Sequence, residues 1–395
     1  MSTTSSGPWS RRRFLTVGAA GLGGAAVAAT GLTLAQREQE VSSTAAPPPP
    51  VAFRGAHQAG VATPQQQAAV FAAFDLPAAA TAAASRDALS RLMRLWTDDI
   101  ERLMAGRAPL GDTEPELSTR PAGLTVTVGL GPRVYEALGR PDARPPGLVD
   151  LPAFGIDRLE ERWSGGDVLV QIGSDDRMAV AHALRVLTKD ARPFVTARWA
   201  QHGFLPSGEG TPRNLMGQVD GTANPAGGEF DSAVWATSGP DWHIGGTTLV
   251  LRRIRMDLDG WDLMGRSERE QVIGRRLDNG APLTGEAEPD APDLEALGPD
   301  GLPVIPSFAH IRLAAPGDGV PRMLRRGYSY DDGPGDSGLL FAAYQADIAT
   351  QFLPVQQRLS ERDLLNRWTT PVGSAVFAIA PGCPPGRWLC DTLLA

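Results

Sequence analysis

The chain is poor in the residues that build most protein metal centres, with two cysteines and five histidines among its 395 residues. Two thiols cannot supply an iron–sulfur cluster or a cysteine-rich structural zinc site, so both are excluded. Any histidine chemistry must rest on His57, His182, His202, His243 or His310. The first four show no close spacing such as H-x-x-x-H, which argues against a metal enzyme without a further cofactor.

An excess of basic charge is also absent. The formal net charge is −8 at pH 7, so nothing in the composition indicates a nucleic-acid partner. Hydrophobic residues make up 42% of the chain and charged residues 21%, which is ordinary for a globular protein. A length of 395 residues favours two packed units over a single core.

The first segment, residues 1–35, has the pattern of an export signal. Consecutive arginines precede Phe14 and a Gly/Ala-rich apolar run, which is typical of the twin-arginine route. The run is short and weakly apolar for a membrane span, so cleavage or loose anchoring is favoured over a membrane anchor. Residues 36–50 are rich in Ser, Thr, Ala and Pro, which predicts a disordered linker. We therefore expect an extracellular, cell-envelope or periplasmic protein.

The remaining chain is predicted to be α+β, with two tandem ferredoxin-like modules over residues 51–210 and 211–395. Each module is expected to have the order β-α-β-β-α-β. In the first, strands are predicted at 51–57, 124–129, 167–172 and near 195, and helices at 85–105 and 175–189. In the second, strands are predicted at 247–254, 308–313, 339–344 and 374–379, and helices at 267–277 and 348–361. The space between packed layers is where a ligand would lie.

Three separated motifs contain the residue types of a redox site. Asp220 lies in the loop 217–225, where neighbouring glycines let the backbone approach a ligand closely. His310 lies in a predicted strand, and Arg325 belongs to an arginine pair followed by glycine. A histidine can be the fifth ligand of a haem iron. An aspartate and an arginine on the opposite face can move a proton and stabilise developing charge.

Together these motifs resemble the dye-decolourising peroxidase family, in its exported bacterial branch. The segments 54–61, 125–131 and 338–348 also match the family's pattern, so the resemblance spans nearly all of the folded region. It implies one haem b per chain, bound in the C-terminal half of a tandem ferredoxin-like fold. It also implies that hydrogen peroxide is reduced while bulky aromatic donors are oxidised.

The resemblance also assigns roles to individual residues. His310 matches the proximal iron ligand, Asp220 the distal acid–base residue, and Arg325 the distal arginine, which would also contact a haem propionate. The remaining candidates for haem binding are Gly221, Thr222 and Ala223 along the haem face, Arg312 as a propionate partner, and Leu340 and Phe341 as walls of the distal pocket. Asp347 is the candidate acceptor of a hydrogen bond from the His310 ring, with a helix cap as the alternative.

In the expected mechanism, Asp220 accepts the peroxide proton and returns it to the distal oxygen, while Arg325 stabilises charge on the leaving oxygen. Water exclusion around Asp220 would raise its pKa toward the working pH, which predicts an acidic optimum. Trp261 and Tyr330 are candidates for carrying electrons from bulky donors, with a purely structural role as the alternative.

Some questions stay open at this stage. The same residues would suit a deferrochelatase that removes iron from haem and works with iron-uptake components. A mere haem carrier is disfavoured, because it has no use for a distal proton shuttle. Neither a homo-oligomer nor a disulfide between Cys383 and Cys390 is decided by the sequence.

Overall fold

The computed structural model describes residues 49–395 except 80, 209 and 318. The export signal predicted over residues 1–35, and the linker predicted over 36–50 apart from its last two residues, lie outside the described part and remain predictions. Among the described residues, no helix combines the length and the apolar character needed to cross a membrane.

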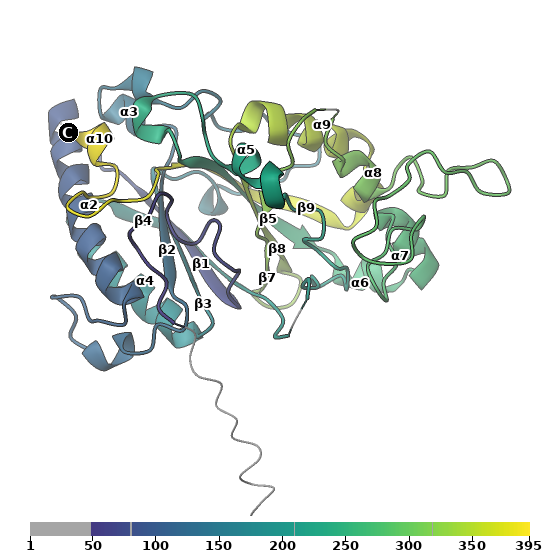
Figure 1. Cartoon of the computed structure of the whole chain (residues 1–395), viewed down its shortest axis with the longest axis horizontal. Helices are drawn as coiled ribbons and strands as arrows, with labels where there is room; N and C mark the ends of the chain where they lie inside the picture. Colours follow the sequence, from purple (N-terminus) through teal and green to yellow (C-terminus); the bar gives the residue numbers. More distant parts are fainter. Residues whose placement is uncertain (1–48, 80, 209, 318) are drawn as a thin grey trace, which may run out of the picture. The chain divides into compact units, whose positions relative to one another are not determined.

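The described residues form both strands and helices along the chain (Figure 1). The strands are β1 (Ala68–Asp75), β2 (Thr125–Leu130), β3 (Val168–Ser174), β4 (Thr196–Phe204), β5 (Thr247–Met256), β6 (Leu324–Arg325), β7 (Tyr328–Asp331), β8 (Ser337–Gln345) and β9 (Thr369–Ile379). The helices are α2 (Ala82–Met104), α3 (Val134–Ala137), α4 (Arg177–Ala191), α5 (Phe230–Val234), α6 (Leu258–Asp262), α7 (Arg266–Ile273), α8 (His310–Ala314), the π-helix η6 (Ile348–Phe352), α9 (Leu353–Arg362) and α10 (Asp391–Leu394).

The strands form one nine-stranded antiparallel sheet in the order β5-β9-β2-β3-β1-β4-β7-β8-β6. Strand β5 also pairs with β8, from Thr248 opposite Gln345 to Arg255 opposite Gly338. This second pairing closes the sheet on itself as a barrel, which leaves fewer free strand edges. The fold is therefore α+β, with an antiparallel barrel at its centre.

The barrel consists of strands β1–β4 and β5–β9, which meet at two short seams. Strand β2 pairs with β9 through only two residue pairs, Gly129 with Ile379 and Leu130 with Ala378. Strand β4 pairs with β7 through Phe204 and Ser329 alone. Pairing within each half is far more extensive, so each half is a sheet of its own that the seams join into one barrel.

Two hydrophobic cores cover the two faces of strands β1–β4. Figure 1 shows α2 and α4 running along one face of these strands. Leu89, Trp96 and Ile100 of α2 are fully buried in the core beneath these helices. The opposite face turns toward the barrel interior, where Phe71 packs with Tyr328. Strand β1 is therefore buried on both faces.

The structure corrects the predicted start of the folded region. Residues 51–57 were expected to form the first strand, but they form a loop that is tied to the sheet at His57 and Pro381. The first strand is β1, whose alanine-rich sequence has low strand propensity and is specified by burial on both faces.

The predicted strand at 308–313 is also wrong. His310 instead begins the five-residue helix α8, and Ala309 precedes it in extended conformation. The apolar residues around His310 are compatible with a strand or a short helix, and short apolar runs do not distinguish the two. The imidazole therefore projects from the first residue of a helix.

Most other predicted elements are present, with shifted ends. Helix α2 begins at Ala82 and not at Ser85, because Thr81 caps it by accepting a hydrogen bond from the Ala84 amide at 3.2 Å. Helix α7 ends at Ile273, where Gly274 adopts a positive φ of 92°, and so does not reach residue 277.

The two cysteines, whose pairing the sequence left open, are not bonded to each other. Cys383 and Cys390 are both buried free thiols. Burial raises the pKa of the Cys390 thiol to about 12, which keeps it protonated and unreactive at neutral pH.

Candidate active site

A tight hairpin presents Asp220. Arg213 and Val219 pair as an isolated bridge, and the Asp220 amide donates a hydrogen bond to the carbonyl of Pro212 at 2.9 Å. At the tip, the side-chain oxygen of Asn214 accepts hydrogen bonds from the amides of Met216 (3.0 Å) and Gln218 (3.3 Å). The hairpin therefore fixes the backbone of Asp220, from which its carboxylate side chain projects.

The predicted partner of this carboxylate lies beside it. The Nη1 atom of Arg325 is 3.8 Å from Oδ1 of Asp220. The two side chains are 25% and 34% exposed, so neither is withdrawn from a ligand. The structure brings together two residues that are about a hundred positions apart in the sequence.

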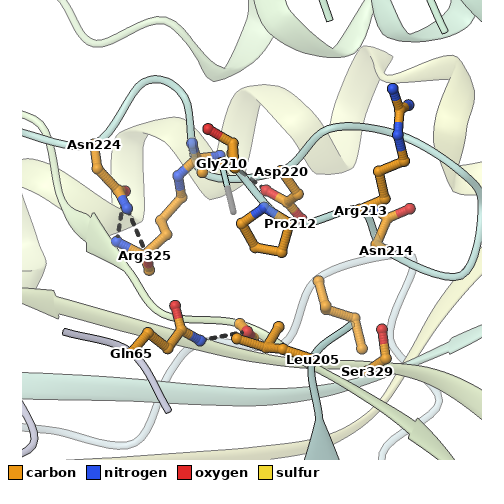
Figure 2. Close-up of a pocket in the computed structure, with 14 residues that line it drawn as sticks. Gln65, Leu205, Gly210, Pro212, Arg213, Asn214, Asp220, Asn224, Arg325 and Ser329 are labelled. Atoms are coloured by element: carbon orange, nitrogen blue, oxygen red, sulfur yellow. Dashed lines mark hydrogen bonds and ion pairs between the residues drawn. The ribbon is translucent and has the colours of Figure 1, made fainter. Parts of the chain in front are cut away.

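A third residue connects the two elements. The side-chain amide of Asn224 donates a hydrogen bond to the carbonyl of Arg325 at 2.8 Å, and its oxygen accepts one from the Arg325 amide at 2.9 Å (Figure 2). The sequence analysis assigned no role to Asn224. The only signal was its position in the same loop, four residues after Asp220.

A cavity of about 330 Å³ lies between this loop and the barrel strands (Figure 2). Its lining includes Asp220, Gly221, Arg325, Gln65 and Leu339. Gly221 has a φ of +129°, a conformation that other residues rarely adopt, so the glycine after Asp220 has a backbone role. The carboxylate of Asp220 and the guanidinium of Arg325 therefore line the same cavity.

Glu288, which lies in a distant loop, binds two residues close to Asp220 in the sequence. Oε1 of Glu288 accepts hydrogen bonds from the hydroxyls of Thr222, at 2.8 Å, and Thr211. Thr222, predicted to lie along a haem face, therefore uses its hydroxyl to fasten the loop. Glu288 was not among the predicted site residues, because its acidic loop gave no sign of contacting the hairpin.

His310 projects from the start of α8 and is held by a carboxylate. Its Nδ1 donates a hydrogen bond to Oδ2 of Asp363 at 2.6 Å. The side chain of Asp363 is only 3% exposed, and its other oxygen accepts a hydrogen bond from the Leu365 amide at 2.9 Å. The carboxylate is therefore fixed by a helix-capping contact and orients the imidazole.

The electrostatics of His310 follow from this contact. Burial lowers the pKa of His310, but the charge of Asp363 and its hydrogen bond raise it by more, so that the pKa is raised overall. Arg325 lowers this pKa and Asp220 raises it, so both charges act on the imidazole. The structure pairs Asp220 with Arg325 beside the cavity and His310 with Asp363, and the assignment of all three central residues to one site stays a prediction.

The predicted partner of His310 was wrong. Asp347 caps the π-helix η6 by accepting hydrogen bonds from the Ala349 amide at 2.8 Å and the Thr350 hydroxyl at 3.0 Å. Asp363 occupies the predicted position beside the imidazole. Both aspartates are helix caps, and the sequence does not distinguish which cap also faces a histidine.

The residues present fit a haem with a histidine ligand. With Nδ1 donating to Asp363, Nε2 of His310 is the nitrogen left for iron, and no protein hydrogen bond to it occurs among the described residues. A carboxylate-bound imidazole is the usual form of a metal-ligating histidine. Asp220 and Arg325, which line the cavity, would supply a bound haem with an acid–base group and a cation.

The structure shows the surroundings of two other residues predicted to contact haem, Leu340 and Arg312. Leu340 is fully buried in the barrel interior, whereas its neighbour Leu339 lines the cavity, because successive side chains in a strand point to opposite faces. The prediction for Leu340 is therefore wrong. Arg312 donates hydrogen bonds to the backbone carbonyls of Ile305 and Leu294, which occupy part of its guanidinium. Its contact with a propionate stays a prediction, as does the role of Phe341.

The two candidate relay residues are both buried. Trp261 is 1% exposed and packs edge-on against Trp368, with ring centroids 5.4 Å apart. Tyr330 has no exposed surface, and the Arg253 guanidinium lies 3.7 Å from the centre of its ring. Neither side chain can contact a bulky donor directly.

The carboxylate-bound His310, together with the neighbouring Asp220 and Arg325, fits the class of haem oxidoreductases. Comparison with known families agrees. The family models described as "Dyp-type peroxidase, N-terminal" and "Dyp-type peroxidase, C-terminal" match residues 58–205 and 211–384. The chain belongs to the Dyp-type peroxidase family, and is thus a peroxidase of the oxidoreductase class.

Curated relatives have two different names. A dye-decolorizing peroxidase of Thermobifida fusca (strain YX) is 43% identical over 331 residues, which cover 78% of this chain and 76% of the relative. A deferrochelatase of Escherichia coli (strain K12) is 36% identical over 408 residues, which cover 94% of each chain.

Solved structures of the family superpose closely on this chain. A DyP-type peroxidase from Cellulomonas bogoriensis is 49% identical and covers 87% of this chain and 98% of its own, with a TM-score of 0.84. Ferric DtpA from Streptomyces lividans is 39% identical and covers 88% and 98%, with a TM-score of 0.83. These similarities extend over the whole described fold.

Proposed function

We propose that this chain binds one haem b, reduces hydrogen peroxide and oxidises bulky aromatic donors. The proposal is supported chiefly by the pairing of His310 with Asp363, and it assigns Asp220 and Arg325, which pair beside the cavity, to the same site. Haem supplies the iron to which peroxide coordinates and the oxidising equivalents that donors later remove.

The chain's own residues have separate tasks in this proposal. His310 binds the iron through Nε2, and Asp363 keeps the imidazole electron-rich by accepting its Nδ1 proton in a hydrogen bond. Asp220 accepts the proton of the incoming peroxide and returns it to the departing oxygen. Arg325, 3.8 Å from Asp220, stabilises negative charge on that oxygen.

An absorption titration tests the proposal. The haem-loaded protein should show a Soret band that shifts when one equivalent of hydrogen peroxide is added, and should then oxidise an anthraquinone dye. A Soret band that does not respond to peroxide would refute peroxidase activity while leaving haem binding intact. Arg325→Leu should slow the shift without abolishing haem binding.

Removal of iron from haem is the second candidate function. It is supported by the deferrochelatase name of several relatives, one of which aligns over 94% of this chain. Incubation with haem and a ferrous chelator, followed by fluorescence of iron-free porphyrin, separates the two functions. Porphyrin release without peroxide turnover would favour the deferrochelatase and would make iron-uptake components the expected partners.

For bulky donors we propose that electrons enter through Trp261. Its edge-on contact with Trp368, which is partly exposed, is a short aromatic path toward the surface. Tyr330 is the weaker candidate because the cation over its ring opposes loss of an electron. Its hydroxyl is nevertheless 3.4 Å from Asp336, which could accept its proton.

We also propose that the two halves of the barrel are ferredoxin-like modules, 51–210 and 211–395. The first has the order β1-α2-β2-β3-α4-β4, with β1 between β3 and β4 in the sheet. The two family models meet between residues 205 and 211, near this boundary. Export by the twin-arginine route, and the location it implies, are proposed from the sequence alone.

A further inference from the structure

We propose that Asn224 is a positioning residue for the peroxide step, because it holds Arg325 in register with Asp220. The inference rests on the proposed function, since it concerns how the distal pair is built. Asn224 also lines the cavity, but among the described residues its side chain forms no hydrogen bond with the Asp220 carboxylate or the Arg325 guanidinium. It acts through the backbone of Arg325.

The Asn224 side chain binds the backbone of Arg325 in the way that a neighbouring strand would. The Asn224 amide nitrogen donates to the Arg325 carbonyl at 2.8 Å, and its oxygen accepts from the Arg325 amide at 2.9 Å. Strand β6 is only two residues long and pairs with β8 on its other side. Asn224 therefore satisfies the backbone groups that β6 presents away from the sheet, which otherwise would need water.

Asn224 is also bound to the loop that carries Asp220. Its backbone amide donates a hydrogen bond to the carbonyl of Gly221 at 3.1 Å, so a single turn separates Asn224 from Asp220. A displacement of the Arg325 backbone relative to the Gly221 turn would break these hydrogen bonds. Misplacement of a reacting group by about 1 Å can cost roughly a hundredfold in rate.

Asparagine is the suitable residue type at this position. The two bonds need one donor and one acceptor on the same planar group. Aspartate has the same shape, but it offers only acceptors and would oppose the Arg325 carbonyl. Alanine removes both bonds. Asn224→Asp and Asn224→Ala therefore test the contact in two different ways.

The chain contains a matched control. The side chain of Asn279 also bridges a carbonyl and an amide, donating to Glu286 at 2.8 Å and accepting from Ala281 at 3.0 Å. It lies outside the cavity lining. Asn224→Asp should slow the peroxide step about ten- to a hundredfold, with the Soret band retained. Asn279→Asp should leave that rate within about twofold of wild type.

A double-mutant cycle identifies the route of action. In an Arg325→Leu background, Asn224→Asp should slow the peroxide step by less than about threefold, because its target has been removed. An equal loss in both backgrounds would overturn the inference while leaving the proposed function standing. If Arg325→Leu alone left the peroxide step unchanged, the proposed role of Arg325 itself would fail.

A measurement on the haem-free protein gives a readout other than activity. Asn224→Ala should speed amide hydrogen exchange at Arg325 at least tenfold, with little change at Ala343 in the neighbouring strand β8. Exchange at Arg325 that stays at its wild-type rate would show that the Asn224 contact does not hold this strand, and would overturn the inference.

Discussion

The Nδ1 atom of His310 lies 2.6 Å from Oδ2 of Asp363, a residue 53 positions further along the chain. The carboxylate is almost fully buried and is itself held by the Leu365 amide. This contact sets which nitrogen of the imidazole carries the proton and which is free for iron. It therefore determines the chemistry of the proximal side.

Asp363→Asn tests this role because it removes the charge and keeps the shape. Haem affinity should fall roughly ten- to a hundredfold, and the ferric–ferrous midpoint potential should rise, since the imidazole becomes a poorer electron donor. Spectroelectrochemistry of the haem-loaded variant measures the potential. Asp347→Asn is the matched control, because it removes a helix-capping aspartate that does not contact His310. Equal potentials in the two variants would contradict the assignment.

Asp220→Asn should slow the peroxide step by roughly 10²–10⁴-fold, because the amide cannot accept the peroxide proton. Stopped-flow absorption at the Soret band measures this step directly. Haem content should remain at the wild-type level, since Asp220 is not an iron ligand. An unchanged rate would remove Asp220 from the proton transfer and leave Arg325 as the only distal group with a role.

Trp261→Phe should slow oxidation of a bulky anthraquinone dye several-fold and leave the peroxide step unchanged. The physical reason is that the buried indole of Trp261 donates a hydrogen bond to the Met216 carbonyl, in the hairpin before Asp220, and packs against the partly exposed Trp368. A small donor that can enter the cavity should be oxidised at the wild-type rate. Tyr330→Phe is the comparison, and a larger loss there than at Trp261 would reverse the proposed order of the two relays.

Stability should depend on pH through a carboxyl pair between α2 and α4. Burial, followed by the charge and hydrogen bond of Asp190, raises the pKa of Asp99 from its ordinary value of 3.8 to about 7. A group whose pKa is raised on folding contributes its full stabilisation at pH values below its pKa in the unfolded chain. That contribution is lost as the pH rises through the folded value, here between about pH 4 and 7.

Asp99→Asn should therefore make the protein more stable at pH 8, by an amount on the order of 2 kcal/mol, and nearly unchanged at pH 4. Urea unfolding across this range measures the difference. Asp87→Asn is the control, because that carboxylate of α2 is exposed, pairs with Arg91 at 2.7 Å and is not among the groups that shift the pKa of Asp99. A stabilisation by Asp99→Asn that is the same at both pH values would show that the carboxyl does not titrate in this range.

Local patterns predicted many elements of the fold, but burial decided the exceptions. Strand β5 and helix α2 were predicted because their patterns of apolar residues are clear. Strand β1 was missed because an alanine-rich segment has low strand propensity, and only the two cores that cover it make it a strand. Closure of the barrel depends on pairing between β5 and β8, which no local pattern encodes.

The central residues of the site were predicted because each lies in a distinctive motif. The residues that orient them were not. Asp363, Asn224 and Glu288 reach the site by hydrogen bonds between distant segments, and aspartate, asparagine and glutamate are common in ordinary loops and caps. Asp347 was predicted and Asp363 was missed, because both cap helices and no local pattern shows which of them faces His310.

Titration of hemin into the apoprotein, followed at the Soret band, tests the central claim most directly. The wild-type chain should bind one equivalent, and His310→Ala should bind at least a hundredfold more weakly or with an altered spectrum. A wild-type protein that stays colourless, or a His310→Ala variant with the same affinity and spectrum, would contradict the account.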